Sequence, residues 1–315
     1  LKLMMGKNET AGMDFILLGL FPTMKHADIL IGVFILIYLA ALTGNSTLIF
    51  LILLNSQLPT PMYFLLSQLS LIDLLFISTI VPKMIMDFFS GKNNISNIAC
   101  GIQMFFSLML GAGEAECILL TLMPCDRYVA ICHPLMYAVI MYQKVCQKMV
   151  MASWFGSTLD AVVQTIYTMH LPKYGHKEID HYICKVMAIL SFSCQDSSPY
   201  KLAVLVRGIL LLLIPFIIIF FSYTVNFITV FHMHSPEGRN KALTTCSSHL
   251  MVMGLFYGPS IFTYMTPVSS HSPAQDKIVS VLVSIITTIL NLFIYSLRNK
   301  DVLGVVKKIL ERCLF

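Results

Sequence analysis

Long apolar stretches alternate with short polar ones along the whole chain. Seven of these stretches are long enough for a helix that crosses the apolar core of a bilayer, which takes about 20 residues. Charged residues interrupt some stretches, such as Asp73 in the second and Arg207 in the fifth, but the flanks remain apolar. The pattern predicts transmembrane helices at residues 29–54, 62–86, 99–125, 145–166, 202–231, 243–265 and 275–297.

The spans predict an all-α fold, a seven-transmembrane helix bundle, because an open strand could not satisfy its backbone hydrogen bonds in lipid. The predicted organisation is an N-terminal tail at 1–28, a transmembrane domain at 29–297 and a C-terminal segment at 298–315. In residues 299–315 apolar and basic positions alternate at helical spacing. This predicts a short amphipathic helix on the inner membrane surface, with its basic side chains facing anionic headgroups.

Composition supports a membrane protein and excludes several classes. The chain is 57% hydrophobic and 12% charged, whereas soluble domains are about a quarter charged. The net charge of +5 is spread without a basic block, so no nucleic-acid partner is expected. Nine cysteines without a C-x-x-C pair argue against a zinc or redox site. His232 and His234 have no third ligand nearby, and we expect no metal, no cofactor and no enzyme.

The orientation of the bundle follows from weak signals that agree. Lysine and arginine are balanced between the two sides, so the charge rule does not decide. Glycosylation sequons begin at Asn8 and Asn94, both on the side of the N-terminus. Cys100 and Cys184 also lie on that side, where a disulfide would need an oxidising compartment; a free thiol at Cys184 is the alternative. We therefore expect the N-terminus outside the cell and the C-terminus in the cytoplasm.

Polar groups inside the predicted spans form one candidate site. Ionisable residues in transmembrane helices are costly and indicate function by default. Asp73 lies midway along the second span, Glu116 lies in the third, and Asn45 and Asn291 lie in the first and seventh. If these residues converge, a small cation or ordered waters could bridge the two acids. The alternative is that one or both acids are protonated and hydrogen-bonded.

A second candidate site is the Asp126–Arg127 pair at the predicted cytoplasmic end of the third span. The pair can neutralise itself and hold Arg127 in one place. Once released, the guanidinium offers five donors to an incoming protein segment. A plain pair of charges at a helix end is the alternative, and the triplet with Tyr128 does not by itself decide between them.

Motifs along nearly the whole chain carry a resemblance to a known family. They are LTGN at 42–45, PMYFLLS at 61–67 followed by Asp73, DRYVAICHPL at 126–135, Ser153 with Trp154, Ser222 with Tyr223, KALTTCSSHL at 241–250 and IYSLRN at 294–299. Together these motifs resemble those of the olfactory receptors, within the rhodopsin-like G-protein-coupled receptors. The 126–135 and 241–250 blocks are highly specific.

The resemblance implies a plasma-membrane receptor that binds a small, mostly apolar odorant in the outer half of the bundle. It also implies activation of a stimulatory G protein of the olfactory type, which raises cyclic AMP. The implied coupling residues are Asp126, Arg127, Tyr128, Tyr223, Lys241 and Tyr295. The resemblance further implies that Asp73 and Glu116 form an intramembrane polar pair and that Cys100 is disulfide-bonded to Cys184.

The odorant pocket is placed by helical facing, within the outer half that the resemblance implies. The expected lining residues are Phe106, Met109, Leu110, Gly113, Arg207, Leu211, Ser260, Ile261, Tyr264, Val281 and Ser284. Each of them is alternatively a helix–helix packing residue. Such pockets are mostly apolar with a few placed polar groups. Met109 stands where amine receptors keep an aspartate, which argues against a biogenic amine.

The chain departs from the family pattern at several positions. Pro124 precedes the Asp-Arg-Tyr triplet and removes a helical hydrogen bond, which predicts a kink that re-aims Arg127. Leu292 follows Asn291 where the family has proline. Cys100 and Arg127 are twenty-seven residues apart, two more than the family spacing. These departures leave open a class A receptor for another ligand, or one with impaired signalling. A seven-helix transporter is a remote alternative, with few charges to line a path.

Overall fold

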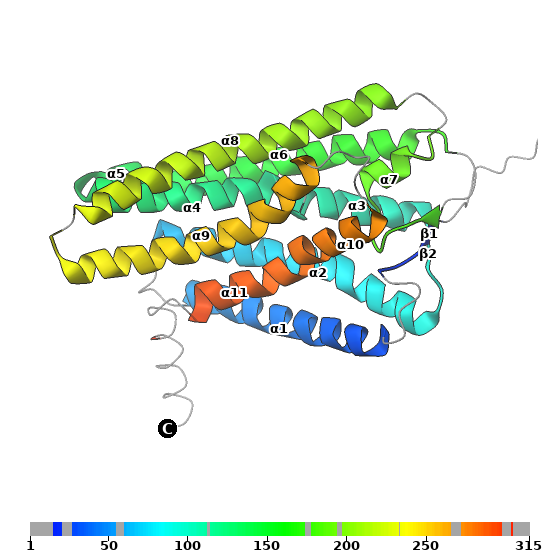
Figure 1. The fold of residues 1–315 in the computed structure, drawn as a ribbon, viewed down its shortest axis with the longest axis horizontal. Helices are drawn as coiled ribbons and strands as arrows, with labels where there is room; N and C mark the ends of the chain where they lie inside the picture. Colours follow the sequence, from blue (N-terminus) through cyan, green and yellow to red (C-terminus); the bar gives the residue numbers. More distant parts are fainter. Residues whose placement is uncertain are drawn as a thin grey trace, which may run out of the picture.

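The structure is a computed structural model that describes residues 15–20, 27–54, 60–111, 114–173, 178–193, 197–232, 234–265, 272–297 and 304. Long helices lie side by side and form a single elongated bundle (Figure 1). They are α1 (Ala27–Leu54), α2 (Pro61–Ser90), α3 (Asn97–Gly111), α4 (Glu114–Cys132), α6 (Gln143–His170), α8 (Ser198–Phe231), α9 (Pro236–Met265), α10 (Pro273–Val281) and α11 (Thr287–Leu297). The predicted all-α helical bundle is confirmed for this part of the chain.

Short elements connect the long helices. A 3₁₀ turn, η1 (Pro134–Met136), and α5 (Tyr137–Ile140) follow α4, and α7 (Val186–Leu190) precedes α8. A π-helical turn, η3 (Leu282–Ile286), joins α10 to α11 without ending the helix. The predicted amphipathic helix at 299–315 lies outside the described residues, apart from Gly304.

Five helical segments among the described residues are long and apolar enough to cross a membrane. They are Ala27–Leu54, Pro61–Ser90, Asn97–Cys132, Ser198–Phe231 and Pro273–Ile294. The predicted spans at 145–166 and 243–265 also form helices, α6 and α9, which pack against the same bundle. Both begin with polar residues, which lowers their mean hydropathy. The structure is thus a helical bundle with five segments that are long and apolar enough to span a membrane.

The third predicted span coincides with α3, described as far as Gly111, and with α4, described from Glu114. Residues 112 and 113 lie outside the described residues. Taken together, Asn97–Cys132 is one apolar segment long enough to cross a membrane. Within it, α3 buries Leu110 and α4 buries Glu116 and Asp126. Gly111 packs so tightly on the Phe76 ring that an added Cβ would overlap it.

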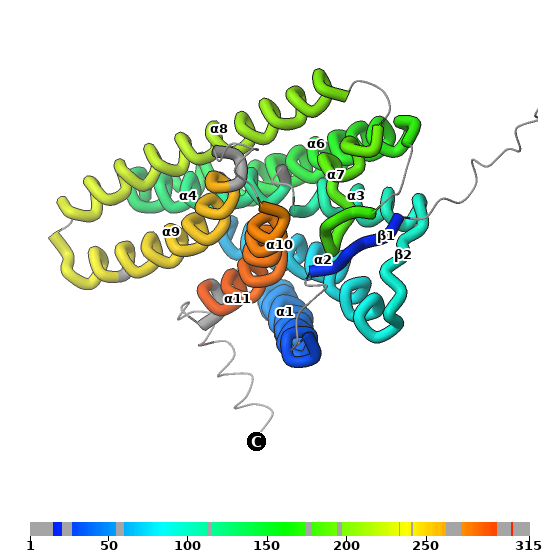
Figure 2. Tube along the Cα trace, turned by 45° about the vertical axis from the view of Figure 1, so that its right-hand side comes forward, coloured from blue at the N-terminus to red at the C-terminus, as the bar shows by residue number. Residues whose placement is uncertain are grey.

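A small sheet closes one end of the bundle, which we call the strand end (Figure 2). Its central strand is β1 (Phe15–Leu17), antiparallel to β2 (Asn94–Ile95) and parallel to β3 (Glu178–Ile179). Phe15 and Leu17 are fully buried in a cluster that also contains the Cys100 and Cys184 side chains. The segment before the first long helix therefore ties two loops together over the bundle.

Candidate functional site

The Asp126–Arg127 pair lies near the C-terminal end of α4, far from the sheet, at what we call the arginine end. Asp126 is completely buried, and Arg127 keeps 22% of its side chain exposed. The Arg127 Nη2 group donates to Asp126 Oδ2 at 3.0 Å and contacts the sulfur of Met62 on α2. The guanidinium is therefore held against its own helix and α2.

A tyrosine that the sequence motifs did not single out completes this pair. The Tyr137 hydroxyl, in the loop helix α5, donates to Asp126 Oδ1 at 2.7 Å. Both oxygens of the buried carboxylate are thus engaged, one by Arg127 and one by Tyr137. Burial, followed by the bond to Asp126, raises the pKa of Tyr137 above its ordinary value, so it stays a neutral donor. Only its position in the run HPLMY, eleven residues after Asp126, could have suggested this role.

The specific KALTTCSSHL block lies opposite Arg127. Its Cys246 and His249, both buried on α9, lie close enough to Arg127 to feel its charge. Tyr223 is buried on α8, and the Tyr128 hydroxyl lies 3.4 Å from His133 Nε2. The side chains of Lys241 and Tyr295 lie outside the described part of the chain. Two of the motifs used for the family resemblance therefore meet at the arginine end.

Pro124 does not end the helix that carries Arg127. α4 is helical from Glu114 to Cys132, with Pro124 buried inside it. The Asp126–Arg127 bond forms two residues later, within the same helix. The proline therefore leaves both the helix and the pair intact.

The four intramembrane polar residues are all buried in the middle of the bundle. Asn291 Nδ2 donates to Asp73 Oδ2 at 3.2 Å, which links α11 to α2. Glu116 lies close enough to Asp73 for their charges to interact. Asn45 donates to the Ala41 carbonyl of its own helix at 3.0 Å. Among the described residues no group of three or more His, Cys, Asp or Glu side chains could hold a metal ion.

Leu292 has a packing role at the position where proline was expected. Its side chain lies directly over Gly44 of α1, where an added Cβ would overlap it. α1 and α11 can therefore approach closely only because residue 44 is glycine. The helical irregularity in this region lies before α11, in the π-helical turn η3. There the Thr287 hydroxyl donates to the Leu282 carbonyl at 2.8 Å.

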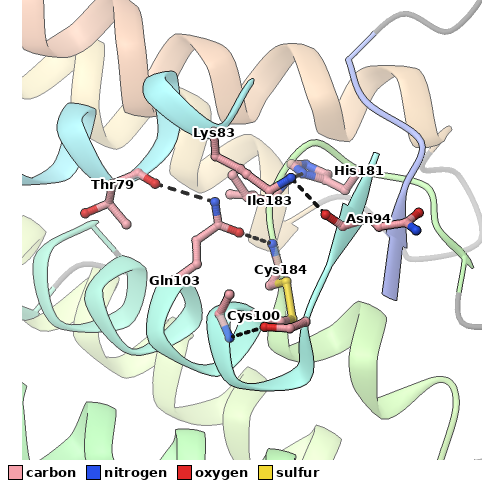
Figure 3. Close-up of a disulfide and its surroundings, with 10 residues drawn as sticks. Thr79, Lys83, Asn94, Cys100, Gln103, His181, Ile183 and Cys184 are labelled. Atoms are coloured by element: carbon pink, nitrogen blue, oxygen red, sulfur yellow. Dashed lines mark hydrogen bonds between the residues drawn. A yellow bond between two sulfur atoms is a disulfide. The ribbon is translucent and has the colours of Figure 1, made fainter. Parts of the chain in front are cut away.

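The disulfide between Cys100 and Cys184 is present, with 5.6 Å between the two Cα atoms. Figure 3 shows Gln103 beside it, accepting a hydrogen bond from the Cys184 amide at 3.0 Å. Lys83 of α2 reaches the Asn94 carbonyl of β2 at 3.1 Å. The disulfide thus joins α3 to the loop beneath the sheet. The glycosylation residue Asn8 lies outside the described residues.

The same loop is tied to α10 and η3 by side chains that the motifs did not identify. Lys277 Nζ lies 2.5 Å from Asp180 Oδ1, Lys185 Nζ donates to Ser280 Oγ at 2.6 Å, and Tyr182 lies 3.3 Å from Ser284 Oγ. Burial lowers the pKa of Lys185 to about 8. Burial, followed by the charges of Lys185 and Lys277, lowers the pKa of His181 to about 2, so this histidine stays neutral.

Apolar cavities lie between long helices in the described part of the chain, and two of them contain predicted site residues. The larger, about 640 Å³, which we call the α4–α8 cavity, is lined by Ile118, Thr121 and Leu122 of α4 and by α8 residues between 203 and 218. The other, about 450 Å³, lies between α8 and α9 and includes Tyr223 and Ile261. Both are lined almost entirely by apolar side chains.

The residues predicted to bind an odorant are not gathered around one cavity. Arg207 and Leu211 line the α4–α8 cavity, and Ile261 lines the other. Phe106 keeps 37% of its surface exposed and lines neither cavity. Met109, Leu110 and Ser284 are buried, whereas Val281 and Ser260 are partly buried. Gly113 and the side chain of Tyr264 lie outside the described part.

Comparison with known sequences decides the family. A sequence model for the family described as Olfactory receptor matches residues 34–312. The chain belongs to the olfactory receptor family. Olfactory receptor 2T27 from Homo sapiens is 48% identical over 306 residues, which are 97% of this chain and 96% of that relative. Olfactory receptor 2T11 from Homo sapiens is 47% identical over 306 residues, again 97% of this chain and 96% of that relative.

The family assignment agrees with the geometry of the arginine end. Olfactory receptors are receptors rather than enzymes, so the charged groups described above are not read as a catalytic set. The matched region contains α2, α4 and α9, whose residues surround Arg127. In this olfactory receptor the Arg127 guanidinium is therefore held by residues that all lie within the region matched by the family model.

Proposed function

We propose that this olfactory receptor binds a small, mostly apolar odorant in the bundle and activates a stimulatory G protein of the olfactory type, raising cyclic AMP. The observation that carries the proposal is the arrangement of Arg127 in a member of this family. Its guanidinium is held by a buried carboxylate at the bundle end opposite the disulfide. Asp126, Arg127, Tyr128, Tyr223, Lys241 and Tyr295 form the proposed coupling surface.

The proposed topology has seven spans, with α6 and α9 added to the five segments that are long and apolar enough to cross a membrane. Their helices of 28 and 30 residues are about 42 and 45 Å long, enough to cross a bilayer. The Cys100–Cys184 disulfide supports placing the strand end outside the cell, because disulfides persist in oxidising compartments. The arginine end and residues 298–315 then face the cytoplasm at the plasma membrane.

The proposed role of the intramembrane cluster is to hold a small cation or ordered waters between Asp73 and Glu116. The interaction of the two buried acids and the Asn291 bond to Asp73 support this proposal. Two carboxylates close together in a low-dielectric interior need either a proton or a cation between them. Asn45 and Asn291 supply the neutral groups around the pair.

The direct test is a cyclic-AMP reporter assay of the receptor at the cell surface against a panel of volatile apolar odorants. We expect a dose-dependent rise for at least one odorant, absent from cells that lack the stimulatory G protein. Surface staining of the same cells separates a silent receptor from a retained one. A receptor that reaches the surface and raises no cyclic AMP with any panel member would contradict the proposal.

Tyr137→Phe is expected to raise basal cyclic AMP several-fold. The change removes the 2.7 Å hydrogen bond to Asp126 and leaves the ring in place. A hydrogen bond to a charged group stabilises by about 1.5–3 kcal/mol, and about 1.4 kcal/mol changes an equilibrium tenfold. Weaker restraint of Asp126 frees Arg127 and favours the active state. Tyr142→Phe, at a nearby exposed tyrosine, is the matched control, and basal activity equal to wild type in Tyr137→Phe would contradict this role.

A further inference from the structure

The α4–α8 cavity has one charged residue in an otherwise apolar wall. That residue is Arg207 on α8. Among the described residues of the lining, the other polar side chain is Thr121, whose hydroxyl donates to the Cys117 carbonyl at 2.7 Å. A ligand in this cavity would therefore meet apolar surface along most of its length and the Arg207 side chain at one place.

Arg207 is paired with an acid from the neighbouring helix. Its Nη2 group lies 2.6 Å from Asp160 Oδ2 on α6, and Gln164 also donates to Asp160 at 2.5 Å. Asp160 is not part of the cavity lining. Arg207 thus lines the cavity, and Asp160, outside the lining, holds its Nη2 group and balances its charge.

This balance of charge decides which polar group the cavity suits. A guanidinium has only hydrogen-bond donors, so it binds acceptors and repels ammonium groups. Because Asp160 already neutralises Arg207, a carboxylate would meet a second negative charge in a weakly screened site. A neutral acceptor such as the carbonyl oxygen of an aldehyde, ketone or ester gains the hydrogen bond without that repulsion.

The position of Arg207 along α8 sets the direction of the ligand. Arg207 lies near the strand end of the cavity, and Ile218 lies eleven residues farther along the helix. At 1.5 Å per residue this distance is about 16 Å. A polar head at Arg207 leaves an apolar groove for an unbranched chain that runs towards the middle of the membrane. A lipid of the outer leaflet has the same arrangement of head and tail.

One side of the cavity opens to the surroundings of the bundle. Val206, Leu210, Ile214 and Ile218 belong to its lining and are also exposed. α8 is one of the segments apolar enough to span a membrane, so its exposed apolar face lies against lipid. A ligand dissolved in the bilayer can therefore reach the cavity without crossing the sheet at the strand end.

We infer that the α4–α8 cavity binds a neutral, unbranched amphiphile whose carbonyl oxygen accepts a hydrogen bond from Arg207 and whose chain lies along α8, and that this ligand enters from the bilayer. Asp160 acts as the specificity-determining residue that disfavours acids of the same chain length. The inference rests on the proposed function, because it names the chemical class of odorant.

Photolabelling of the purified full-length receptor in nanodiscs tests the site without a G protein. The probe is a dodecanal analogue with a diazirine at the far end of its chain, and the competitors are dodecanal, dodecanoic acid and dodecane. We expect labelled peptides from residues 118–122 or 214–218, with dodecanal competing best. Labelling elsewhere, or labelling that dodecanal does not reduce, would overturn the inference.

Charge variants test the assigned roles. Arg207→Gln should weaken competition by dodecanal by about tenfold or more, as expected for a lost hydrogen bond to a charged group. Asp160→Asn removes the balancing charge, so dodecanoic acid should compete about tenfold better than with wild type while dodecanal changes little. Lys201→Gln removes a positive charge of α8 outside the cavity and should change neither. An unchanged ranking of aldehyde and acid in Asp160→Asn would refute the specificity role.

A third variant covers the case in which the charge variants fail to fold. Ile214→Trp fills the cavity from its exposed side and leaves the Arg207–Asp160 pair in place. The Ile214→Trp receptor should unfold at the same temperature as wild type and lose specific labelling. Labelling that persists in this variant would overturn the inference. Specific labelling in a receptor that gives no cyclic-AMP response would instead contradict the proposed function and uphold the site.

Discussion

Arg127→Ala is expected to abolish the odorant-evoked rise in cyclic AMP while the receptor still reaches the cell surface. Arg127 keeps part of its side chain exposed at the arginine end, so its removal leaves no large cavity. The change removes the proposed contact with the G protein, for which a guanidinium supplies donors in a fixed planar fork. Asp126 would still be hydrogen-bonded by Tyr137, which limits the cost of leaving a buried carboxylate without its charged partner.

Two further variants make this prediction specific. Arg127→Lys keeps the charge but loses the planar fork, so it should recover only a small part of the response. Lys144→Ala, at the exposed start of α6, removes a positive charge from the same end of the bundle and should respond as wild type. The measurement is the odorant dose response, normalised to surface staining of each variant. A wild-type response in Arg127→Ala would contradict the coupling role.

The sequence was sufficient to predict most of the fold, because apolar length is a strong signal. All seven predicted spans coincide with helices of the described residues, and five helical segments are long and apolar enough to cross a membrane. The predicted third span coincides with α3 and α4, which flank residues 112 and 113 outside the described part of the chain. Helical periodicity could predict these spans because apolar residues recur along each of them.

Site residues that belong to a sequence motif could be predicted. Contacts between segments far apart in the sequence could not. The disulfide and the Asp126–Arg127 pair followed from motifs and are present. The contacts of Asp126 with Tyr137 and of Arg207 with Asp160 depend on how loops and helices pack. The odorant residues were placed by helical facing alone, which does not show how neighbouring helices pack. The cavity that contains Arg207 uses Ile118, Thr121 and Leu122 of α4, which helical facing did not select.

Cys184→Ser is expected to remove nearly all receptor from the cell surface. The disulfide joins residues 84 positions apart, and closing a loop of that size in the unfolded chain is worth roughly 4–5 kcal/mol. It also anchors the loop that packs Ile179 and Ile189 around Phe15 and Leu17 of the central strand. Losing 1–2 kcal/mol can already lower the cellular abundance of a protein several-fold, so this larger loss should leave most molecules retained. The measurement is surface staining relative to total receptor.

The double variant distinguishes the bond from the individual thiols. If the disulfide is the stabilising interaction, Cys100→Ser with Cys184→Ser should be no worse than either single change, because one substitution already breaks the bond. Cys132→Ser is the matched control, since Cys132 is a free thiol whose contact with the Thr229 hydroxyl a serine can keep. Surface levels in Cys184→Ser equal to those of Cys132→Ser would show that the sheet and the ties from the loop to α10 hold the strand end closed without the disulfide.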